Sequence, residues 1–273
     1  MNAKEISIDT NRTKNRLLLC NQTSSTPTLF LHGFTGTADS WSEVIGKINA
    51  CAIAVDIVGH RASTFKDLNS DYNIDDWCDD LSQVIDSLNI SKLNLCGYSM
   101  GGRLAIAFAA RYPQKINQLI IESSSLGIIE NKAKKQRFKE DLKLSQLIES
   151  DLDEFIQIWE NNPLFLNQAE RNNMAFLKQR ETRASQDPMQ LSKSLRVFSQ
   201  GTMKFYGPEF SKFDFPVSTI NGKEDEKYLK IGSRMCQLNK NCSQYILEAG
   251  HNVHLENPKS FANTLEKVLN FNL

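Results

Sequence analysis

Residues Gly97-Tyr98-Ser99-Met100-Gly101 follow the pattern G-x-S-x-G, in which a serine stands on a sharp turn between a strand and a helix. The apolar run before this turn predicts a strand, and a helical pattern begins at Met100. Glycines allow so tight a turn, and the start of the helix places positive charge near the hydroxyl. The pattern therefore predicts a reactive Ser99. The alternative is a helix start that merely uses small residues.

A reactive serine needs a base, and the base needs an orienting carboxylate. When the serine lies on a turn of this kind, the chain order is serine, acid, histidine. Asp225 follows a predicted strand at 215–221, and His251 follows a predicted strand at 243–247. We therefore predict a Ser99–His251–Asp225 triad. Glu224 is the rival acid, and Asp225 as an ordinary turn residue is the other alternative.

Two backbone amides are expected to stabilise a developing negative charge near Ser99. One belongs to Met100, the residue after the serine, and the second is expected at Phe34, in the loop after an earlier strand. His32, at the start of that loop, is expected to support the loop rather than to react. His60 also lies in a predicted loop, and we expect a structural role for it.

Short apolar runs that read as buried strands alternate with helical patterns, which indicates an α/β fold with a mostly parallel, doubly wound sheet. The strands are expected at 27–33, 51–56, 92–97, 116–122, 215–221 and 243–247. Helices are expected at 75–88, capped by Asn73, at 100–111 and at 258–271. Segments 6–9 and 17–20 could add an antiparallel hairpin at one edge of the sheet.

The alternation stops between residues 126 and 203, where charges are frequent and the periodicity is helical. We interpret this stretch as a helical cap over the carboxyl edge of the sheet, where open α/β folds bind ligands. The core would then consist of residues 1–125 and 204–273. The best-defined apolar face of the cap comprises Ile148, Leu152, Phe155, Ile156 and Trp159.

The composition is that of an ordinary globular protein: 273 residues, 40% hydrophobic and 23% charged. Thirty-two basic residues balance 32 acidic ones, which argues against a nucleic-acid partner bound through bulk positive charge. We expect no membrane span, because no apolar run reaches eighteen residues. The polar first residues argue against a signal peptide, so a cytoplasmic location is expected. Six scattered cysteines predict reduced thiols, and the sequence shows no metal-site motif.

Taken together, these motifs resemble the α/β-hydrolase family over essentially the whole chain. Four runs resemble one branch, the 2-succinyl-6-hydroxy-2,4-cyclohexadiene-1-carboxylate synthases of menaquinone biosynthesis. They are Tyr-Ser-Met-Gly-Gly-Arg-Leu at 98–104, Glu-Ser-Ser-Ser-Leu-Gly at 122–127, Trp-Glu-x-x-Pro-Leu-Phe at 159–165 and Gly-His-Asn-Val-His-Leu-Glu-Asn-Pro at 250–258. The loops at 58–63 and 125–128 depart from the family pattern, and neither contains a triad residue.

The resemblance implies a lyase that eliminates pyruvate from 2-succinyl-5-enolpyruvyl-6-hydroxy-3-cyclohexene-1-carboxylate without a metal or cofactor. This substrate carries several carboxylates, and Arg103, one helical turn after Ser99 and facing the cap, suits such a ligand. The resemblance implies Arg137 as a second substrate ligand. It also suggests Arg183, with Arg180 as its rival.

Two aromatic residues and a lysine near these motifs have open roles. Tyr98 could donate a hydrogen bond to the substrate or only pack. Trp159, on an apolar helical face, would ordinarily belong to the core, and the resemblance implies the pocket wall. Lys227 is expected at the surface. Either a monomer or a homodimer would fit. The alternative functions are a carboxylesterase or carbon–carbon bond hydrolase that uses the same triad, and a receptor without activity.

Overall fold

The computed structural model describes residues 3–21, 26–165 and 167–270. Its sheet has the strand order β1-β2-β4-β3-β6-β7-β8-β9, with β5 paired to β2. The strands are β1 (Ala3–Asp9), β2 (Thr13–Cys20), β3 (Thr28–Leu31), β4 (Ala52–Val55), β5 (Thr64–Phe65), β6 (Leu93–Tyr98), β7 (Ile116–Glu122), β8 (Val217–Gly222) and β9 (Cys242–Leu247). All six predicted core strands are therefore confirmed, and only the two-residue strand β5 was not expected.

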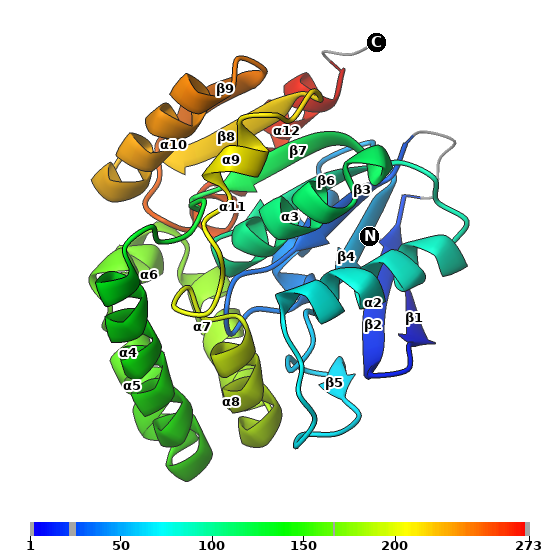
Figure 1. The fold of residues 1–273 in the computed structure, drawn as a ribbon. Coiled ribbons are helices and arrows are strands. Elements are labelled where there is room, and N and C mark those ends of the chain that lie inside the picture. Colours follow the sequence, from blue (N-terminus) through cyan, green and yellow to red (C-terminus); the bar gives the residue numbers. More distant parts are fainter. Residues whose placement is uncertain (1–2, 22–25, 166, 271–273) are drawn as a thin grey trace.

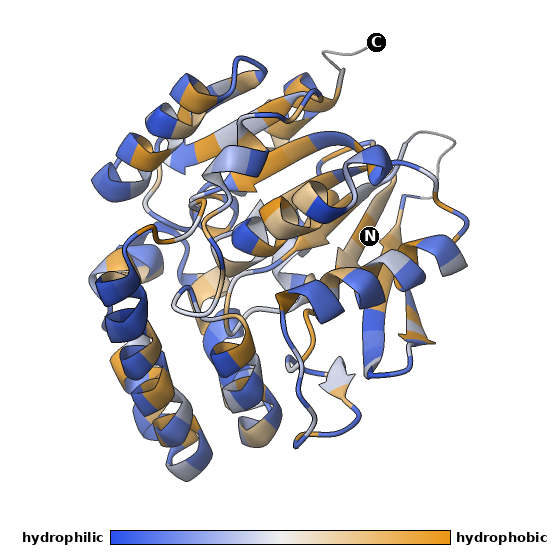
Figure 2. Ribbon diagram, viewed as in Figure 1, coloured by the Kyte–Doolittle hydropathy of each residue, from blue (hydrophilic) through white to orange (hydrophobic). Residues whose placement is uncertain are grey.

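The neighbours from β4 to β9 are parallel, whereas β2 pairs with β1 and β4 in the antiparallel sense. The predicted edge hairpin is therefore confirmed, although its strands are longer than expected. The central strands β3, β4 and β6 are buried along their whole length. They appear mainly in the hydrophobic colours of Figure 2, as expected for a sheet covered on both faces.

Helices cover both faces of the sheet (Figure 1). On one face α2 (Ile74–Ser87), α3 (Met100–Arg111) and α10 (Glu226–Leu238) contribute to one large core; on the other, α1 (Ser42–Ile45) and α12 (Pro258–Asn270) form a second. The Asn73 side chain caps α2 by accepting the amides of Asp75 and Asp76 at 2.8 and 3.2 Å, as predicted. The terminal helix is also confirmed; Phe271, its last predicted residue, lies outside the described residues.

After β7 the chain forms a run of successive helices, and Figure 1 shows them grouped beside one end of the sheet. They are α4 (Asn131–Ser150), α5 (Leu152–Glu160), α6 (Gln168–Arg171), α7 (Asn173–Ala184) and α8 (Pro188–Val197). The short elements are α9 (Gly207–Phe210), α11 (Val253–Glu256) and the 3-10 turns Ala38–Trp41, Pro113–Lys115 and Pro163–Phe165. We call α4 to α8 the cap helices; the boundaries 126 and 203 stay a prediction.

The predicted apolar face of the cap does not lie on a single helix. The helix is interrupted at Asp151, between α4 and α5. The Asp151 side chain accepts the Glu154 amide at 2.8 Å and so caps α5. Ile148 of α4 and Phe155 of α5 nevertheless meet in one small core, together with Leu191 and Leu195 of α8. The apolar spacing therefore predicted correctly which residues are buried. The N-cap at Asp151 determines where α5 begins.

The described part of the chain contains no helix that is long and apolar enough to cross a membrane. Within it, no group of three or more potential metal-binding side chains comes together. Four of the cysteines are buried, as expected for core residues: Cys20, Cys51, Cys78 and Cys96. Cys236 of α10 and Cys242 of β9 lie with their Sγ atoms 2.6 Å apart, a proximity that the sequence did not suggest.

Candidate active site

Ser99 stands between the end of β6 and the start of α3, as predicted. Its backbone has a φ of 49° and a ψ of −105°, a strained conformation for a residue with a side chain. The turn needs glycine on both sides because a Cβ on Gly97 would lie 2.4 Å from the Gly101 carbonyl oxygen. A Cβ on Gly101 would lie equally close to the carbonyl oxygen of Leu31 in β3. The glycines thus let the turn press against the sheet.

The structure brings the three predicted triad residues together. His251 Nε2 lies 3.3 Å from Ser99 Oγ, and His251 Nδ1 lies 2.6 Å from Asp225 Oδ2. The side chains of His251 and Asp225 are almost completely buried. Asp225 also caps α10, since its Oδ1 accepts the Tyr228 amide at 3.2 Å. The arrangement can move a proton between Ser99 and His251 and hold the imidazolium that results.

Glu224, the rival acid, is bonded to residues of the cap rather than to His251. Its exposed carboxylate contacts Arg171 of α6 and accepts the Asn167 side-chain amide at 3.2 Å. These contacts hold the pKa of Glu224 below its usual value. The geometry therefore favours Asp225 as the carboxylate partner of His251. Lys227 is exposed beside the Tyr228 ring, as expected for a surface residue.

The loop after His251 is tied to the serine turn through Glu122, the last residue of β7. The Glu122 carbonyl oxygen accepts the Ser99 amide at 2.9 Å. Its fully buried carboxylate accepts the backbone amide of His254 at 2.9 Å and lies 2.7 Å from His254 Nδ1. The sequence predicted no role for the contact between Glu122 and His254, because the two residues meet only in the folded chain. The parallel register of β6 and β7 places Glu122 beside Tyr98.

A cavity of about 240 Å³ lies in front of the triad and is lined by both the core and the cap helices. Ser99, His251, Phe34 and Met100 border it, so the two residues predicted to supply amide donors line the same cavity as the serine. The predicted substrate ligands Tyr98, Arg103, Arg137 and Trp159 line it too. Phe165, Phe198 and Tyr228 complete an aromatic wall that the sequence did not predict.

Arg103 is buried in this cavity without a carboxylate partner among the described residues. Its Nη2 donates to the Phe198 carbonyl oxygen at 3.3 Å, while its buried Nε has no partner in the described structure. Burial lowers the pKa of the Arg103 guanidinium to about 10, so it stays charged at neutral pH. An unpaired buried cation is costly, and an anionic ligand would complete its interactions.

Arg137 of α4 reaches the same cavity from the cap side. Its Nε donates to both carboxylate oxygens of Asp141 at 2.9 Å, and its side chain stays about one-third exposed (34%). The buried Asp141 also accepts the Ser199 hydroxyl at 2.7 Å. The aspartate therefore orients Arg137 at the cavity while the guanidinium remains accessible to a ligand.

Two aromatic side chains of the cavity carry hydrogen-bond donors. The Trp159 ring packs against Phe34 and Phe155 with centroid distances of 5.4 and 5.7 Å, and its buried Nε1 has no partner in the described structure. Burial raises the pKa of the Tyr98 phenol well above its usual value, so the hydroxyl keeps its proton. Trp159 is therefore both part of the cap packing and a cavity wall.

Arg183 does not lie at the cavity, which corrects its assignment as a substrate ligand. Its buried guanidinium donates to Glu160 at 2.8 Å, to Gln179 at 2.8 Å and to the Thr35 hydroxyl at 3.2 Å. Its rival Arg180 also pairs with Glu160, at 2.5 Å, from the cap surface. Both arginines lie on α7 and face Glu160 of α5, so they hold the cap helices together.

His32 and His60 support the loop that carries Phe34, as predicted. His32 Nε2 accepts the Ile57 amide at 2.9 Å, and its Nδ1 lies 2.7 Å from the Gly33 carbonyl oxygen. His60 Nε2 accepts the Thr35 amide at 3.2 Å, and its Nδ1 lies 3.0 Å from the Ile57 carbonyl oxygen. Each ring therefore uses one nitrogen as donor and one as acceptor, which requires the neutral form.

These neutral histidines predict that stability falls in mild acid. Burial lowers the pKa of His60 from 6.5 to about 4 and that of His32 well below 6.5. The unfolded chain thus binds more protons below pH 6.5, and the free energy of unfolding should fall as the pH falls. We expect His60→Gln to reduce the slope of the free energy of unfolding against pH by up to about 1.4 kcal/mol per pH unit between about pH 6.5 and 5. Urea unfolding at a series of pH values measures this slope. An unchanged slope would mean that folded His60 is protonated.

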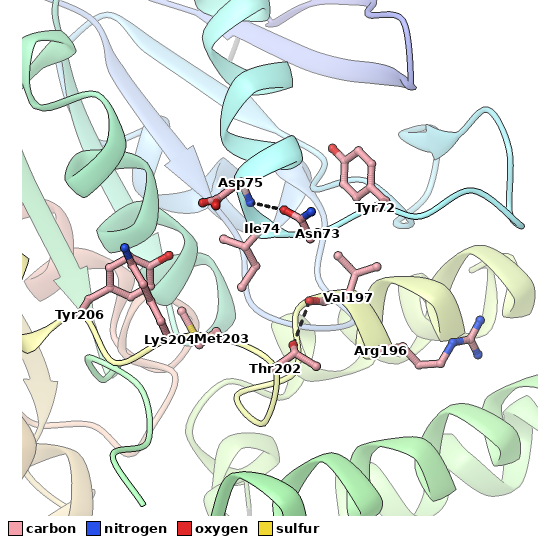
Figure 3. A pocket seen from close by; sticks show the side chains of 10 residues that line it. All are labelled: Tyr72, Asn73, Ile74, Asp75, Arg196, Val197, Thr202, Met203, Lys204 and Tyr206. Carbon is pink, nitrogen blue, oxygen red and sulfur yellow. Dashed lines mark hydrogen bonds between the residues drawn. The ribbon is translucent and has the colours of Figure 1, made fainter. Parts of the chain in front are cut away.

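A larger cleft of about 470 Å³ lies between the start of α2 and the end of α8 (Figure 3). The charged residues on its wall already have partners: Asp75 pairs with Arg111, Arg196 with Glu149 and Lys204 with Glu209. Figure 3 shows Asn73 occupied in capping the helix and Thr202 bonded to the Val197 carbonyl. The cleft contains no triad residue, so we assign the chemistry to the smaller cavity.

Several known proteins are similar to this chain over most of its length. The family model described as the alpha/beta hydrolase fold matches residues 26–258. The chain is 32% identical over 242 residues to the putative 2-succinyl-6-hydroxy-2,4-cyclohexadiene-1-carboxylate synthase of Bacillus subtilis (strain 168), covering 88% of each protein. It is 26% identical to the synthase of that name from Enterobacter sp. (strain 638), covering 88% of this chain and 90% of the relative. The solved structure of MenH from S. aureus superposes with a TM-score of 0.87 at 28% identity, covering 95% of this chain and 98% of that one.

Proposed function

The chain belongs to the α/β-hydrolase family and, within it, to the 2-succinyl-6-hydroxy-2,4-cyclohexadiene-1-carboxylate synthases, and from this premise we propose its reaction. It is a lyase of menaquinone biosynthesis. It eliminates pyruvate from 2-succinyl-5-enolpyruvyl-6-hydroxy-3-cyclohexene-1-carboxylate, and the product is 2-succinyl-6-hydroxy-2,4-cyclohexadiene-1-carboxylate. Below we call the reactant the enolpyruvyl substrate.

The proposed reaction begins with proton transfers along the triad. His251, oriented by Asp225 at 2.6 Å, draws the proton of Ser99 and makes the serine oxygen basic. Ser99 then removes the ring proton next to the succinyl ketone. The electron pair of that C–H bond moves through the ring double bond and breaks the bond from the ring to the enolpyruvyl oxygen. His251 returns a proton to the departing enolpyruvate, which becomes pyruvate.

Negative charge develops on the ketone oxygen during proton removal. The backbone amides of Phe34 and Met100 are the proposed donors to that oxygen, and a donor of this kind contributes about 3–4 kcal/mol to the transition state. Because the serine acts as a base, the reaction needs no covalent enzyme intermediate. The same triad used as a nucleophile would give a carboxylesterase or a carbon–carbon bond hydrolase, which is the alternative outcome of the test below.

One observation supports the lyase over a neutral-ester hydrolase most strongly: Arg103 is buried and charged at the cavity without a carboxylate partner among the described residues. Arg137, oriented by Asp141 and still accessible, offers a second guanidinium at the same cavity, and the two together suit a substrate with several carboxylates. A neutral ester would leave the Arg103 cation unpaired. We propose Tyr98 and Trp159 as further hydrogen-bond donors to the substrate.

The function is tested by the release of pyruvate from freshly prepared enolpyruvyl substrate, coupled to lactate dehydrogenase. We expect enzyme-dependent release far above the spontaneous decay of the compound and unaffected by a metal chelator. Hydrolysis of p-nitrophenyl acetate should stay far slower than by a dedicated esterase. Pyruvate release only at the spontaneous rate by a folded protein would refute the lyase, and fast ester hydrolysis would establish the alternative.

We further propose that the enzyme works in the cytoplasm as a monomer or a homodimer. The absence of a membrane-spanning helix in the described residues is compatible with this location. Sedimentation of the purified protein distinguishes the two assembly states directly.

A further inference from the structure

The side chain of Glu256 folds back under the loop that carries His251. Glu256 ends α11, and its carboxylate accepts two backbone amides: Gly250 donates to Oε2 at 2.5 Å and Asn252 donates to Oε1 at 3.2 Å. These two residues flank His251 in the chain. The Glu256 side chain is only 2% exposed, so the two bonds are shielded from water. One buried carboxylate therefore fixes the backbone on both sides of the histidine.

A cap residue reaches the same carboxylate. Arg171, at the end of α6, places its Nε 3.4 Å from Glu256 Oε2, and its Nη2 contacts Glu224, the residue before Asp225. Arg171 thus touches both the loop that holds the triad acid and the loop that holds the triad base. The neighbouring Asn172 donates to the Leu255 carbonyl oxygen at 2.8 Å and adds a second link between the cap and the histidine loop.

We propose that Glu256 is a positioning residue for His251 and that Arg171 stabilises Glu256 in this position from the cap. We call this arrangement the Glu256 clamp; it comprises Glu256, Arg171 and the amides of Gly250 and Asn252. The inference rests on the proposed function, in which His251 serves as the base of the triad. It assigns to the cap helices a part in ordering the triad, besides covering the substrate.

The physical reason is the narrow geometry that the triad requires. The His251 ring must keep Nδ1 at the Asp225 carboxylate and Nε2 toward Ser99 Oγ at the same time. A rotation of the loop backbone moves both nitrogens together, and a misplacement of about 1 Å can cost about 100-fold in rate. A single carboxylate that accepts the amides on both sides resists this rotation. Its charge needs compensation when buried, and Arg171 supplies it.

The decisive variant is Glu256→Gln, which keeps the shape of the side chain. A glutamine has one acceptor oxygen and one amino group, so one of the two loop amides would face a donor instead of an acceptor. We expect kcat for pyruvate release to fall about 10- to 100-fold while KM stays within about twofold, because the substrate ligands are untouched. A side chain that only stabilises the fold would lower the melting temperature and leave kcat of the folded fraction unchanged.

A second readout does not depend on activity. The ¹⁵N shifts of the His251 imidazole in histidine-labelled protein report its tautomer and its bond to Asp225. We expect these shifts to move in Glu256→Gln. The matched control is Arg180→Met, which also removes a cap arginine from a glutamate partner, Glu160, yet touches neither triad loop. It should leave both kcat and the His251 shifts as in the wild type.

The outcomes separate the clamp from the reaction. Wild-type kcat together with unchanged His251 shifts in folded Glu256→Gln would overturn the clamp. If the wild-type protein releases no pyruvate above the spontaneous rate, the proposed function fails, and the shifts alone decide about the clamp. If Glu256→Gln does not fold, Arg171→Met takes its place, with an expected fall in kcat of about 3- to 10-fold. An unchanged kcat and unchanged shifts in that variant would equally refute the proposal.

Discussion

Ser99→Ala should lower kcat/KM for pyruvate release by about 10³- to 10⁴-fold while the protein stays folded. General-base catalysis contributes about 10²- to 10⁴-fold, and the substitution removes the Ser99 oxygen that lies 3.3 Å from His251 Nε2. Binding and the two backbone amides remain, so some activity above the spontaneous decay should persist. KM should change little, because Arg103 and Arg137 are untouched. Steady-state pyruvate release and circular dichroism check both parts.

A second experiment tests whether Ser99 acts as a base or as a nucleophile. A general base forms no bond to the substrate, so mass spectra of wild-type enzyme quenched during turnover should show no adduct on Ser99. Ser211→Ala is the matched control, because the exposed Ser211 hydroxyl donates to the Pro208 carbonyl oxygen and Ser211 does not line the cavity of Ser99. It should keep wild-type kcat. A rapidly formed Ser99 adduct with the enolpyruvyl substrate, or wild-type kcat in Ser99→Ala, would contradict the mechanism.

The strands and the triad could be predicted because both follow from local signals. A strand of a parallel sheet is buried on both faces, so runs such as that in β7 show as short apolar segments. The G-x-S-x-G turn marks one strand end, and the chain order serine, acid, histidine then points to two others. Asp225 and His251 follow β8 and β9, whose parallel pairing with the rest of the sheet brings their carboxyl ends to one edge.

The partners of buried charges could not be predicted, because they depend on which helices meet. Arg103 and Arg183 are both arginines on helices, and the sequence suggests a substrate for each. In the structure, α5 places Glu160 beside Arg183, while no described carboxylate pairs with Arg103. The Glu256 clamp escaped prediction for the same reason, since it needs the side chain of Glu256 to fold back onto its own loop.

Helix breaks and short strands were equally hidden. The break between α4 and α5 depends on one capping residue, Asp151, inside a continuous apolar pattern. Strand β5 has two residues, and only its pairing with β2 makes it a strand. Tyr228 packs on His251 at 4.6 Å because Asp225 caps α10 and so fixes the start of that helix. A helix start predicted at Asp225 would have indicated that Tyr228 lies in the first turn of α10, near the triad.

Replacement of Arg103 should lower the catalytic efficiency of the enzyme and raise its thermal stability. In Arg103→Met we expect kcat/KM to fall about 10²- to 10³-fold, mostly through KM, because a charge-assisted contact to a substrate carboxylate is lost. The free energy of unfolding of the ligand-free protein should rise by about 1–2 kcal/mol. The reason is that a buried cation bonded to the Phe198 carbonyl oxygen is replaced by an apolar side chain of similar length. In a chain of this size that corresponds to a rise in Tm of about 2–6 °C.

The opposite signs of the two effects distinguish a binding residue from a structural one. A structural arginine, such as Arg183, should lower the Tm when it is replaced, because its buried bonds to Glu160 and Gln179 are lost. Arg103→Lys keeps the charge but loses the forked donor geometry, so it should recover only part of kcat/KM. The matched control is Arg111→Met on the same helix, where an exposed arginine pairs with Asp79. It should leave KM unchanged. A lower Tm with wild-type KM in Arg103→Met would show that Arg103 supports the fold and that the substrate carboxylate is bound elsewhere.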